Sequence, residues 1–300
     1  MRYEGTFRRR SRQLRRFAAG FTTSATRHGG VIVPTFWWDG HPNFGDDLTP
    51  WLLPRYGVVP LYSEPRQARL IGVGSLLEFL APEHTGVVWG SGLMEDHVHR
   101  LSYVTALAVR GPLTAERIGL SAEPAYGDPG ILVARHLPQP RPSGMPVLVP
   151  HGHHRSSPAL ARLIHRSGDA LRVVNVHQRA APALRQIAAG SVILTTSLHG
   201  LITADAFGIP AVWTTLEPAL DGGDFKFRDY EAAVTPGRTR FRAFADGATL
   251  DELTADAWAA DPARIAQLGD ALESSLARLA SMDVGQVPFP RGIVRAVRRR

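Results

Sequence analysis

Apolar runs alternate with amphipathic stretches along most of the chain from residue 31 onward. This rhythm is typical of βα units, in which each buried strand of a mostly parallel sheet is followed by a helix. In the first half the pattern predicts strands at 31–36, 69–73, 87–89 and 103–109. The amphipathic stretches predict helices at 46–55, 75–80 and 112–118.

A proline-rich segment separates this series from a second one. Four prolines fall within residues 137–146, a density that neither a strand nor a helix interior tolerates. Beyond this linker the rhythm predicts strands at 147–149, 172–176, 192–195 and 211–214. Helices are predicted at 159–165, 181–189 and 198–207, with closing helices at 250–259 and 262–280.

Length and pattern together predict two domains. At 300 residues the chain exceeds the size of about 250 residues at which a single core usually stops growing. We therefore expect an α/β fold of two Rossmann-like lobes with a cleft between them, completed by C-terminal helices. The expected segments are a basic tail (1–30), an N-terminal lobe (31–137), a proline-rich linker (138–146), a C-terminal lobe with closing helices (147–285) and a second basic tail (286–300).

Composition narrows the chemistry. The chain has no cysteine, which excludes disulfides and thiolate metal sites and fits a reducing compartment. Of its 34 basic residues only Lys226 is lysine and the rest are arginine, as expected from arginine-rich codon usage. A lysine that persists in such a background hints at a need for a compact ammonium group.

Arginines crowd both ends of the chain and contribute to its net charge of +7. Such runs are most often solvated tails, and their functional alternative is attraction to nucleic acid or to an anionic membrane surface. A bilayer-spanning stretch of about 20 apolar residues is absent, and polar residues at 22–27 interrupt any apolar run of signal-peptide length. We expect a cytoplasmic protein whose basic ends allow peripheral contact with the inner face of the membrane.

His199 is the first candidate for chemistry, because it stands where a predicted strand turns into a helix. Ligands of parallel sheets collect at such corners, and a neutral imidazole there can move a proton near pH 7. The alternative is a histidine that caps the helix. Gly200 leaves room for a ligand, and the helix N-terminus favours an anion, so both features favour function. A hydrolase triad of Ser197, His199 and Asp205 is rejected, because Ser197 lies outside a Gly-x-Ser-x-Gly turn.

A second polar corner follows the first predicted strand. Asn43, Asp46 and Asp47 either cap the next helix or bind the hydroxyls of a neutral substrate, since a carboxylate pair would repel an anion. Trp38 lies close by in the sequence and offers a surface for stacking on a sugar ring, although tryptophans are more often buried in a core.

Three basic side chains are candidates for binding an anion. Arg110 ends a predicted strand, and a guanidinium group matches the geometry of phosphate or carboxylate. Lys226 and Arg228 follow the last predicted strand, where the alternative is a solvated, basic helix start. His151 belongs to a histidine cluster without the spacing of a metal site, so we expect no metal and place His151 in the cleft lining.

Several short pieces of the sequence, taken together, resemble the polysaccharide pyruvyltransferase family and most closely its succinoglycan-type ketolases. They occur in the family's order across about residues 31–235, and the ordered set is more specific than any one piece. The pieces are NFGDDLTPW (43–51), IGVGS (71–75), WGSG (89–92), VRGPLTA (109–115), GDP (127–129), PH (150–151), LHG (198–200) and FKF (225–227).

The resemblance implies a fold like that of glycosyltransferase-B enzymes and a reaction with phosphoenolpyruvate as donor substrate. A cyclic pyruvate ketal would form on two hydroxyls of one sugar in a polysaccharide, glycolipid or lipid-linked repeat unit, with release of phosphate and no further cofactor. His199 matches the family's acid/base, and Arg110 matches the arginine taken to hold the donor. The expected donor-binding residues are Arg110, Lys226, Arg228, Gly200 and Ser197. The expected acceptor-binding residues are Asn43, Asp46, Asp47, Trp38 and His151.

One departure and two rival functions accompany this prediction. Many family members carry an arginine two residues before the histidine, where this chain has Ser197, which leaves one anion contact unassigned. A nucleotide-sugar-dependent glycosyltransferase would use the same cleft and bind a nucleoside diphosphate. A nucleic-acid-binding protein built on the arginine tails would bind in a salt-sensitive way without His199. No known nucleic-acid motif accompanies those tails, so we expect no nucleic-acid partner.

Overall fold

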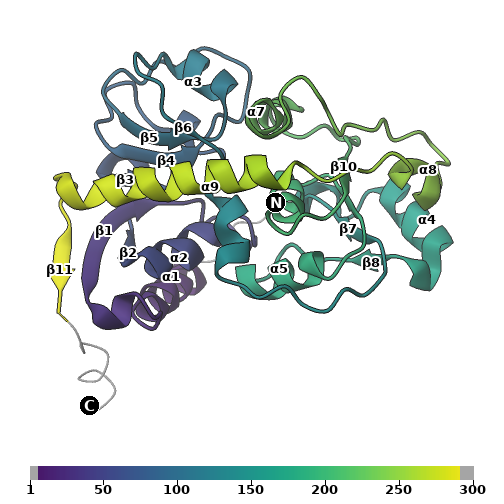
Figure 1. The fold of residues 1–300 in the computed structure, drawn as a ribbon, viewed down its shortest axis with the longest axis horizontal. Helices are drawn as coiled ribbons and strands as arrows, with labels where there is room; N and C mark the ends of the chain where they lie inside the picture. Colours follow the sequence, from purple (N-terminus) through teal and green to yellow (C-terminus); the bar gives the residue numbers. More distant parts are fainter. Residues whose placement is uncertain (1–5, 291–300) are drawn as a thin grey trace.

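The computed structural model describes residues 6–290 and contains two mainly parallel sheets (Figure 1). In the first sheet β1 pairs with β2 on one edge and with β3 and β11 on the other, and only the pairing with β11 is antiparallel. The remaining strands extend this sheet beyond β3 in the order β4, β5, β6. Its strands are β1 (Gly30–Phe36), β2 (Val58–Tyr62), β3 (Leu70–Ile71), β4 (Val87–Ser91), β5 (Thr105–Val109), β6 (Ala125–Tyr126) and β11 (Val287–Phe289).

The second sheet is wholly parallel and has the order β10-β9-β7-β8. Its strands are β7 (Val147–Val149), β8 (Arg172–Val173), β9 (Ile193–Thr195) and β10 (Ala211–Trp213). The helices that accompany the two sheets are α2 (Leu48–Leu52), α3 (Pro112–Ile118), α4 (Pro158–Ser167), α5 (Ala180–Ala188), α6 (Leu198–Ala206), α7 (Phe225–Val234) and α8 (Leu250–Thr254). The predicted α/β class is confirmed.

The differences from the predicted elements have local causes. The helix predicted at 75–80 is a single 3-10 turn, Leu77–Phe79. β2 was not predicted because Pro60 interrupts its apolar run, and the strand tolerates this proline since it pairs on one side only. Helix α7 was missed as well, because its apolar and charged residues follow no clear amphipathic period.

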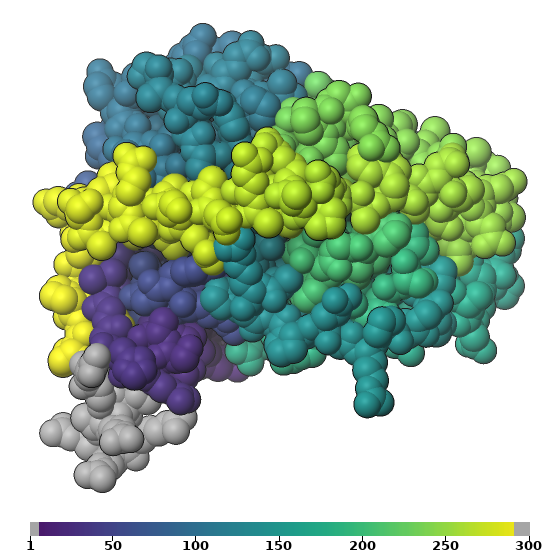
Figure 2. Space-filling view, viewed as in Figure 1, coloured from purple at the N-terminus to yellow at the C-terminus, as the bar shows by residue number. Residues whose placement is uncertain are grey.

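The closing helix α9 (Pro262–Ala277) packs against elements of both halves of the molecule, and not against the C-terminal lobe alone. It packs against β5 and β6 as well as α6 and α7, and Trp89 in β4 donates its indole N–H to the Leu272 carbonyl at 3.1 Å. Figure 2 shows this segment as a continuous yellow band across the face of the molecule. One hydrophobic core contains side chains from both sheets, such as Val33 and Val149, so the two halves are packed together.

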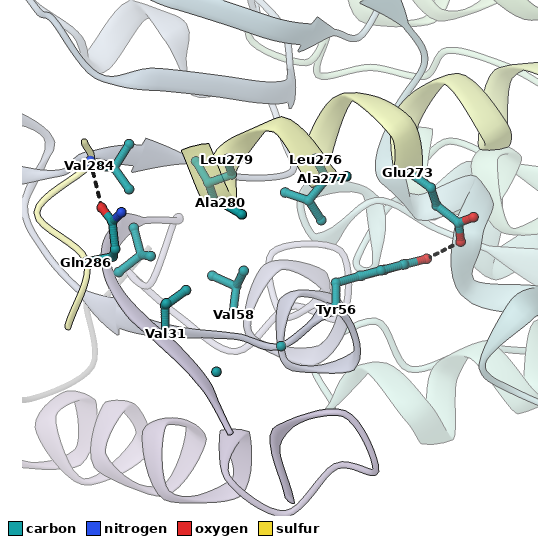
Figure 3. A pocket seen from close by; sticks show the side chains of 13 residues that line it. Val31, Tyr56, Val58, Glu273, Leu276, Ala277, Leu279, Ala280, Val284 and Gln286 are labelled. Carbon is teal, nitrogen blue, oxygen red and sulfur yellow. Dashed lines mark hydrogen bonds between the residues drawn. The ribbon is translucent and has the colours of Figure 1, made fainter. Parts of the chain in front are cut away.

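A mostly apolar cavity of about 380 Å³ lies beneath the end of α9 (Figure 3). Its lining includes Val31 and Val58, which stand at the amino ends of their strands. At its rim the Tyr56 hydroxyl donates to Glu273 at 2.8 Å. Parallel sheets bind ligands at the carboxyl ends of their strands. This cavity lies at the amino ends, and therefore at the opposite end of the strands from the expected site.

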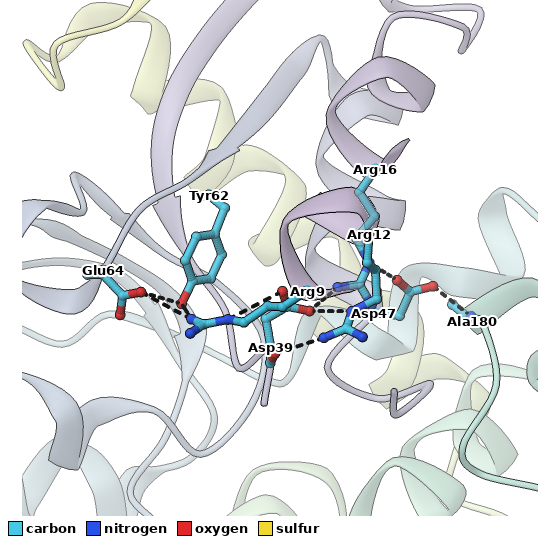
Figure 4. A network of polar contacts seen from close by, with 8 residues as sticks. All are labelled: Arg9, Arg12, Arg16, Asp39, Asp47, Tyr62, Glu64 and Ala180. Carbon is cyan, nitrogen blue, oxygen red and sulfur yellow. Dashed lines mark hydrogen bonds and ion pairs between the residues drawn. The ribbon is translucent and has the colours of Figure 1, made fainter. Parts of the chain in front are cut away.

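Half of the predicted N-terminal basic tail (1–30) is an ordered helix, because residues Thr6–Gly20 form α1. Arg9, Arg12 and Arg16 are spaced by three and four residues and therefore share one face of this helix. That face meets acidic side chains of the first sheet's loops (Figure 4). These three arginines are consequently engaged within the protein and are not available as a solvated, membrane-binding run.

The arginine contacts of α1 support the loop that carries the first polar corner. Arg12 donates to Asp39 at 2.7 Å, and Arg16 donates to Asp47 at 2.6 Å. The other carboxylate oxygen of Asp47 accepts from the backbone N–H of Ala180 at 2.8 Å, at the start of α5. Asp47 thus connects α1, the loop after β1 and the second sheet's helix α5.

The predicted C-terminal tail (286–300) begins as strand β11, which pairs with β1. The arginines at 291, 295 and 298–300, like Arg2, lie outside the described residues. Across residues 6–290 no helix combines the length and the apolar character that crossing a membrane requires.

Removing the contact between α1 and Asp47 tests whether the helix stabilises the fold. Arg16→Ala leaves the buried Asp47 carboxylate, and in part Asp39, without its cation. We expect a loss of about 3 kcal/mol in the free energy of unfolding, since one partner of a largely buried ion pair is lost. Urea unfolding measures this. The exposed neighbour Arg15→Ala should change stability by less than about 0.5 kcal/mol, and equal midpoints for the two variants would contradict a docked helix.

Candidate active site in the cleft between the sheets

Loops that follow strands of both sheets line one cleft of about 620 Å³. The first sheet contributes residues after β1, β3 and β4, and the second contributes residues after β7, β9 and β10. Parallel strands place their carboxyl ends on one edge, where ligands of such sheets bind. The two polar corners singled out in the sequence therefore face each other. Among the lining side chains are Trp38, Asn43, Asp46, Ser75, His151, Ser197, His199 and Lys226.

His199 enters the cleft from the first turn of α6. Thr195, at the end of β9, accepts a hydrogen bond from Ser197 N at 2.9 Å and donates to the Val149 carbonyl at 2.8 Å, which fixes the turn from strand to helix. A Cβ atom on Gly200 would lie only 2.4 Å from the Thr195 hydroxyl. Gly200 therefore allows α6 to pack closely on β7 and β9, and it is not among the residues that line the cleft.

Asp128 faces His199 and was not predicted as a site residue. Its Oδ2 lies 3.9 Å from His199 Nε2, and neither atom has a hydrogen-bond partner among the described residues. The Asp128 side chain is fully buried, and that of His199 is 12% exposed. The sequence signal for Asp128 was the family piece Gly-Asp-Pro at 127–129, which does not indicate what the aspartate contacts.

Burial moves the protonation of this pair towards the neutral forms. It raises the pKa of Asp128 to about 7, although Gly130 N–H and Arg110 act in the opposite direction. Burial, assisted by the positive charges of Lys226 and Arg110, lowers the pKa of His199 to about 3. A neutral imidazole beside a carboxyl group that titrates near neutrality is thus the resting state of the pair.

Lys226 brings a positive charge into the cleft from the first turn of α7. Its ammonium group has no hydrogen bond or ion pair with any residue between 6 and 290. Burial, followed by repulsion from Arg110, lowers the pKa of Lys226 to about 8, so most of the lysine is charged at neutral pH. The N-terminus of α6 opens onto the same cleft through Ser197 and His199 and adds backbone N–H groups that attract an anion.

Arg110 lies beneath the cleft and does not line it. Its guanidinium is fully buried, donates to Asp229 at 2.9 Å and to the Ser75 hydroxyl at 2.7 Å, and also donates to the Leu93 carbonyl. Asp229 in turn accepts from the backbone and hydroxyl of Thr114 at the start of α3. The structure therefore gives Arg110 a role in holding Ser75 and in raising the local positive potential, in place of the direct donor contact that was expected.

Arg228 does not reach the cleft either. It is two residues from Lys226 on α7, and residues at that spacing do not share a helix face. Its exposed side chain pairs with Asp224 at 3.0 Å and with Asp96 at 3.2 Å. Its expected contact with a donor is therefore not supported.

The expected acceptor residues are divided by the structure. Asn43, Asp46, Trp38 and His151 line the cleft, and Trp38 stacks on Phe79 with ring centres 5.3 Å apart. Asp47 instead points away to α1 and α5 and does not line the cleft.

Burial shifts two of the lining groups on this side towards their neutral forms. The deep position of Asp46 raises its pKa to about 7, against a smaller lowering by Arg16. Burial, followed by Lys226 and the neighbouring histidines, lowers the pKa of His151 to about 2. Within the part of the chain that the structure describes, no group of three or more histidine, aspartate or glutamate side chains is arranged to hold a metal ion.

Fold and site together define an α/β protein with a cleft between its sheets, in which the Lys226 ammonium and the N-terminus of α6 lie beside amide, hydroxyl and imidazole groups and the carboxyl groups of Asp46, Glu95 and Asp221. No protein-family profile matches the chain. The chain is 32% identical to the succinoglycan biosynthesis protein ExoV of Rhizobium meliloti (strain 1021) over 240 aligned residues, which cover 72% of each protein. The chain belongs to the polysaccharide pyruvyltransferase family.

The buried Asp128 makes stability depend on pH in a defined direction. Its pKa is about 7 in the folded protein and near 3.9 in an unfolded chain, so folding takes up a proton between these values and stability falls as pH rises from about 4 to 7. Asp128→Asn removes this ionisation. We expect the melting temperature of the variant minus that of the wild type, measured by calorimetry, to increase from about pH 4 to 7 and to remain positive above pH 7. A difference that is independent of pH would contradict the raised pKa.

Proposed function

We propose that this protein transfers the pyruvyl group of phosphoenolpyruvate onto two hydroxyls of one sugar, forming a cyclic ketal and releasing phosphate. The observation that carries the proposal is the composition of the cleft. The Lys226 ammonium and the N-terminus of α6, which suit a donor with two anionic groups, share the cleft with amide, hydroxyl and imidazole side chains that suit a sugar, and with the carboxyl groups of Glu95 and Asp221. Family membership supports the same reaction.

The donor fits the part of the cleft between α6 and α7. Phosphoenolpyruvate carries a carboxylate and a phosphate, and Lys226 can pair with one of them at short range. Backbone N–H groups at the start of α6 can bind the other, as helix N-termini bind phosphate in many proteins. Ser75 and Ser197 offer hydroxyls on the same walls, and Arg110 adds positive potential from beneath.

The acceptor fits the opposite wall. Asn43, Asp46 and His151 present amide, carboxyl and imidazole groups that hydrogen-bond to hydroxyls. Because burial raises the pKa of Asp46 to about 7, its carboxyl repels the neighbouring anionic donor less than a fully ionised carboxylate would. The stacked pair of Trp38 and Phe79 provides an apolar face of the kind that packs against a sugar ring.

The chemistry requires one proton to be given and two to be taken. Carbon 3 of the donor gains a proton, which makes carbon 2 electrophilic, and a sugar oxygen bonds to carbon 2. The bond from carbon 2 to the phosphate oxygen then breaks, and the second sugar oxygen closes the ring. One hydroxyl proton replaces the proton given to carbon 3, and the other leaves with phosphate. His199 is the acid and base at this centre.

The biological setting follows from the relative and the donor. ExoV is named for succinoglycan biosynthesis, and we propose that this chain likewise modifies a bacterial exopolysaccharide or its glycolipid precursor. A cytoplasmic location suits the use of phosphoenolpyruvate, which is a cytoplasmic metabolite. Two sheets that face one cleft also support a resemblance to the glycosyltransferase-B architecture.

Ligand-induced stabilisation tests the donor assignment directly. Phosphoenolpyruvate at one hundred times its dissociation constant should add about 2.7 kcal/mol to the free energy of unfolding. We expect this gain in the wild type and its near-complete loss in Lys226→Met, which keeps the side-chain volume but removes the charge. The measurement is a melting curve with phosphoenolpyruvate, phosphate, pyruvate, sulfate and UDP at matched ionic strength.

Arg228→Ala is the matched control, because it removes a positive charge from the same helix outside the cleft. It should retain the full response to phosphoenolpyruvate. Equal shifts with every anion would refute a specific donor site. A shift with UDP alone would favour a nucleotide-sugar glycosyltransferase in its place.

A further inference from the structure

The proposed reaction needs an acid at carbon 3 of the donor, and His199 by itself is a poor one. Its imidazolium form is scarce at neutral pH, because burial and two neighbouring cations lower the pKa to about 3. A neutral imidazole can still donate a proton from one nitrogen if its other nitrogen accepts one at the same time. The structure contains a source for this second proton.

Asp128 presents one carboxyl oxygen to His199, and a hydrogen bond to its other oxygen fixes the carboxyl group in place. Oδ1 accepts from the backbone N–H of Gly130 at 2.8 Å, which fixes the plane of the carboxyl group. Oδ2 lies 3.9 Å from Nε2 of His199, and both atoms are buried and unpartnered within residues 6–290. A movement of about 1 Å would give a hydrogen bond of ordinary length, and such bonds are often long before a ligand binds.

The second ring nitrogen of His199 is left for the ligand. Of the two ring nitrogens only Nε2 is a buried atom without a hydrogen-bond partner, and His199 lines the cleft, so we assign Nδ1 to the side of the cleft. It lies next to Gly45, where a Cβ atom would come within 2.2 Å of it. The imidazole thus stands between a closed carboxyl site and the open cleft, with one nitrogen on each side.

We propose that Asp128 and His199 form a proton relay in which Asp128 stores the proton that reaches the donor. This inference rests on the proposed function and assigns to Asp128 the part of a positioning and proton-supplying residue that acts through His199. It differs from a single histidine acid because the imidazole remains neutral before and after each transfer.

The proton balance of the relay closes over one turnover. At the start Asp128 is a carboxylic acid that donates to Nε2, and His199 carries its own proton on Nδ1. Nδ1 gives that proton to carbon 3 while Nε2 takes the proton of Asp128, which becomes a carboxylate. The first sugar hydroxyl then returns a proton to Nδ1, and Nε2 returns its proton to Asp128. The proton of the second hydroxyl leaves with phosphate.

The charged groups around the pair decide at which pH the relay is loaded. Arg110, directly after β5, acts on both members of the pair, and Lys226 of α7 acts on His199. Tyr230 of α7 donates to Asp205. His151 follows β7 of the second sheet, and His199 contributes to the lowering of its pKa. Burial outweighs the cations at Asp128, whose carboxyl is protonated below about pH 7 and ionised above it. The relay is therefore loaded on the acid side of neutrality.

The ring tautomer of His199 reports the relay without any substrate. A protonated Asp128 donates to Nε2 and leaves the ring hydrogen on Nδ1, whereas an ionised Asp128 accepts from Nε2–H. Imidazole ¹⁵N chemical shifts of histidine-labelled protein distinguish these forms, and His199→Gln identifies the resonance among the 12 histidines. We expect a change from Nδ1–H to Nε2–H between about pH 6 and 8, with His199 neutral throughout.

Asp128→Asn supplies the decisive comparison. Its amide keeps an oxygen for Gly130 N–H and donates to Nε2, so it should hold His199 as the Nδ1–H tautomer at every pH in this interval. Glu273→Gln, the same chemical change at the rim of the cavity under α9, should leave the titration as in the wild type. One tautomer throughout in the wild type, or an imidazolium near pH 7, would overturn the relay even if the variant fails to fold.

Turnover separates the relay from the proposed function. Phosphate release is measured with phosphoenolpyruvate and methyl glucopyranoside or methyl galactopyranoside, and with water as the acceptor that yields pyruvate. Wild-type activity should fall above about pH 7, and Asp128→Asn should lose a factor of about 10² to 10⁴ in kcat while KM for phosphoenolpyruvate changes little. Unchanged kcat with an unchanged pH profile would refute the relay. A wild type that never consumes phosphoenolpyruvate would refute the proposed function. The tautomer titration would then still test whether Asp128 and His199 exchange a proton, because it needs no substrate.

Discussion

Desolvation of ionisable side chains at the meeting point of two parallel sheets is the constraint on which the site depends. Because the carboxyl ends of both sheets face one cleft, Asp46, Asp128 and His199 lie away from bulk water. Each is shifted towards its neutral form, and Lys226 keeps most of its charge at neutral pH. Such a site can attract an anion and still exchange protons, since a carboxyl group whose pKa lies near 7 can donate or accept a proton at neutral pH. The arginines of α1 contribute indirectly, because they hold the loop between Asp39 and Asp47 that carries Asn43 and Asp46.

Much of the fold was predictable because burial in parallel sheets leaves a strong imprint on the sequence. The strand at 147–149 and the helix at 112–118 agree with the structure to the residue. Helix α1 was missed because its arginines resemble a solvated tail when counted, whereas their spacing of three and four residues already pointed to one helix face. The acidic partners of that face come from loops after β1 and β2, and no local pattern reveals such long-range pairing. The crossing of α9 onto the first sheet has the same non-local origin.

The strand-to-helix turns that form the site could be predicted from the sequence, but the directions in which their side chains point could not. His199, Asn43, Asp46 and Lys226 could be found because strand ends of parallel sheets collect ligands. Arg110 stands at such an end too, yet the backbone turns its side chain beneath the cleft to Asp229. Arg228 cannot share a helix face with Lys226 two residues earlier, but this holds only within helix α7, which was not predicted. Asp128 could not be assigned from the sequence, because its significance is the burial of one oxygen against the imidazole of His199.

The most direct test of the account follows the donor carbon into the product. Phosphoenolpyruvate labelled with ¹³C at carbon 3 is incubated with the protein and a bacterial exopolysaccharide from which pyruvate ketals have been removed by mild acid. We predict a labelled methyl group bonded to a ketal carbon on the polysaccharide, together with one phosphate for each ketal, and the loss of both in His199→Gln. A label that stays in phosphoenolpyruvate, while UDP or a nucleotide sugar binds the same cleft, would contradict it.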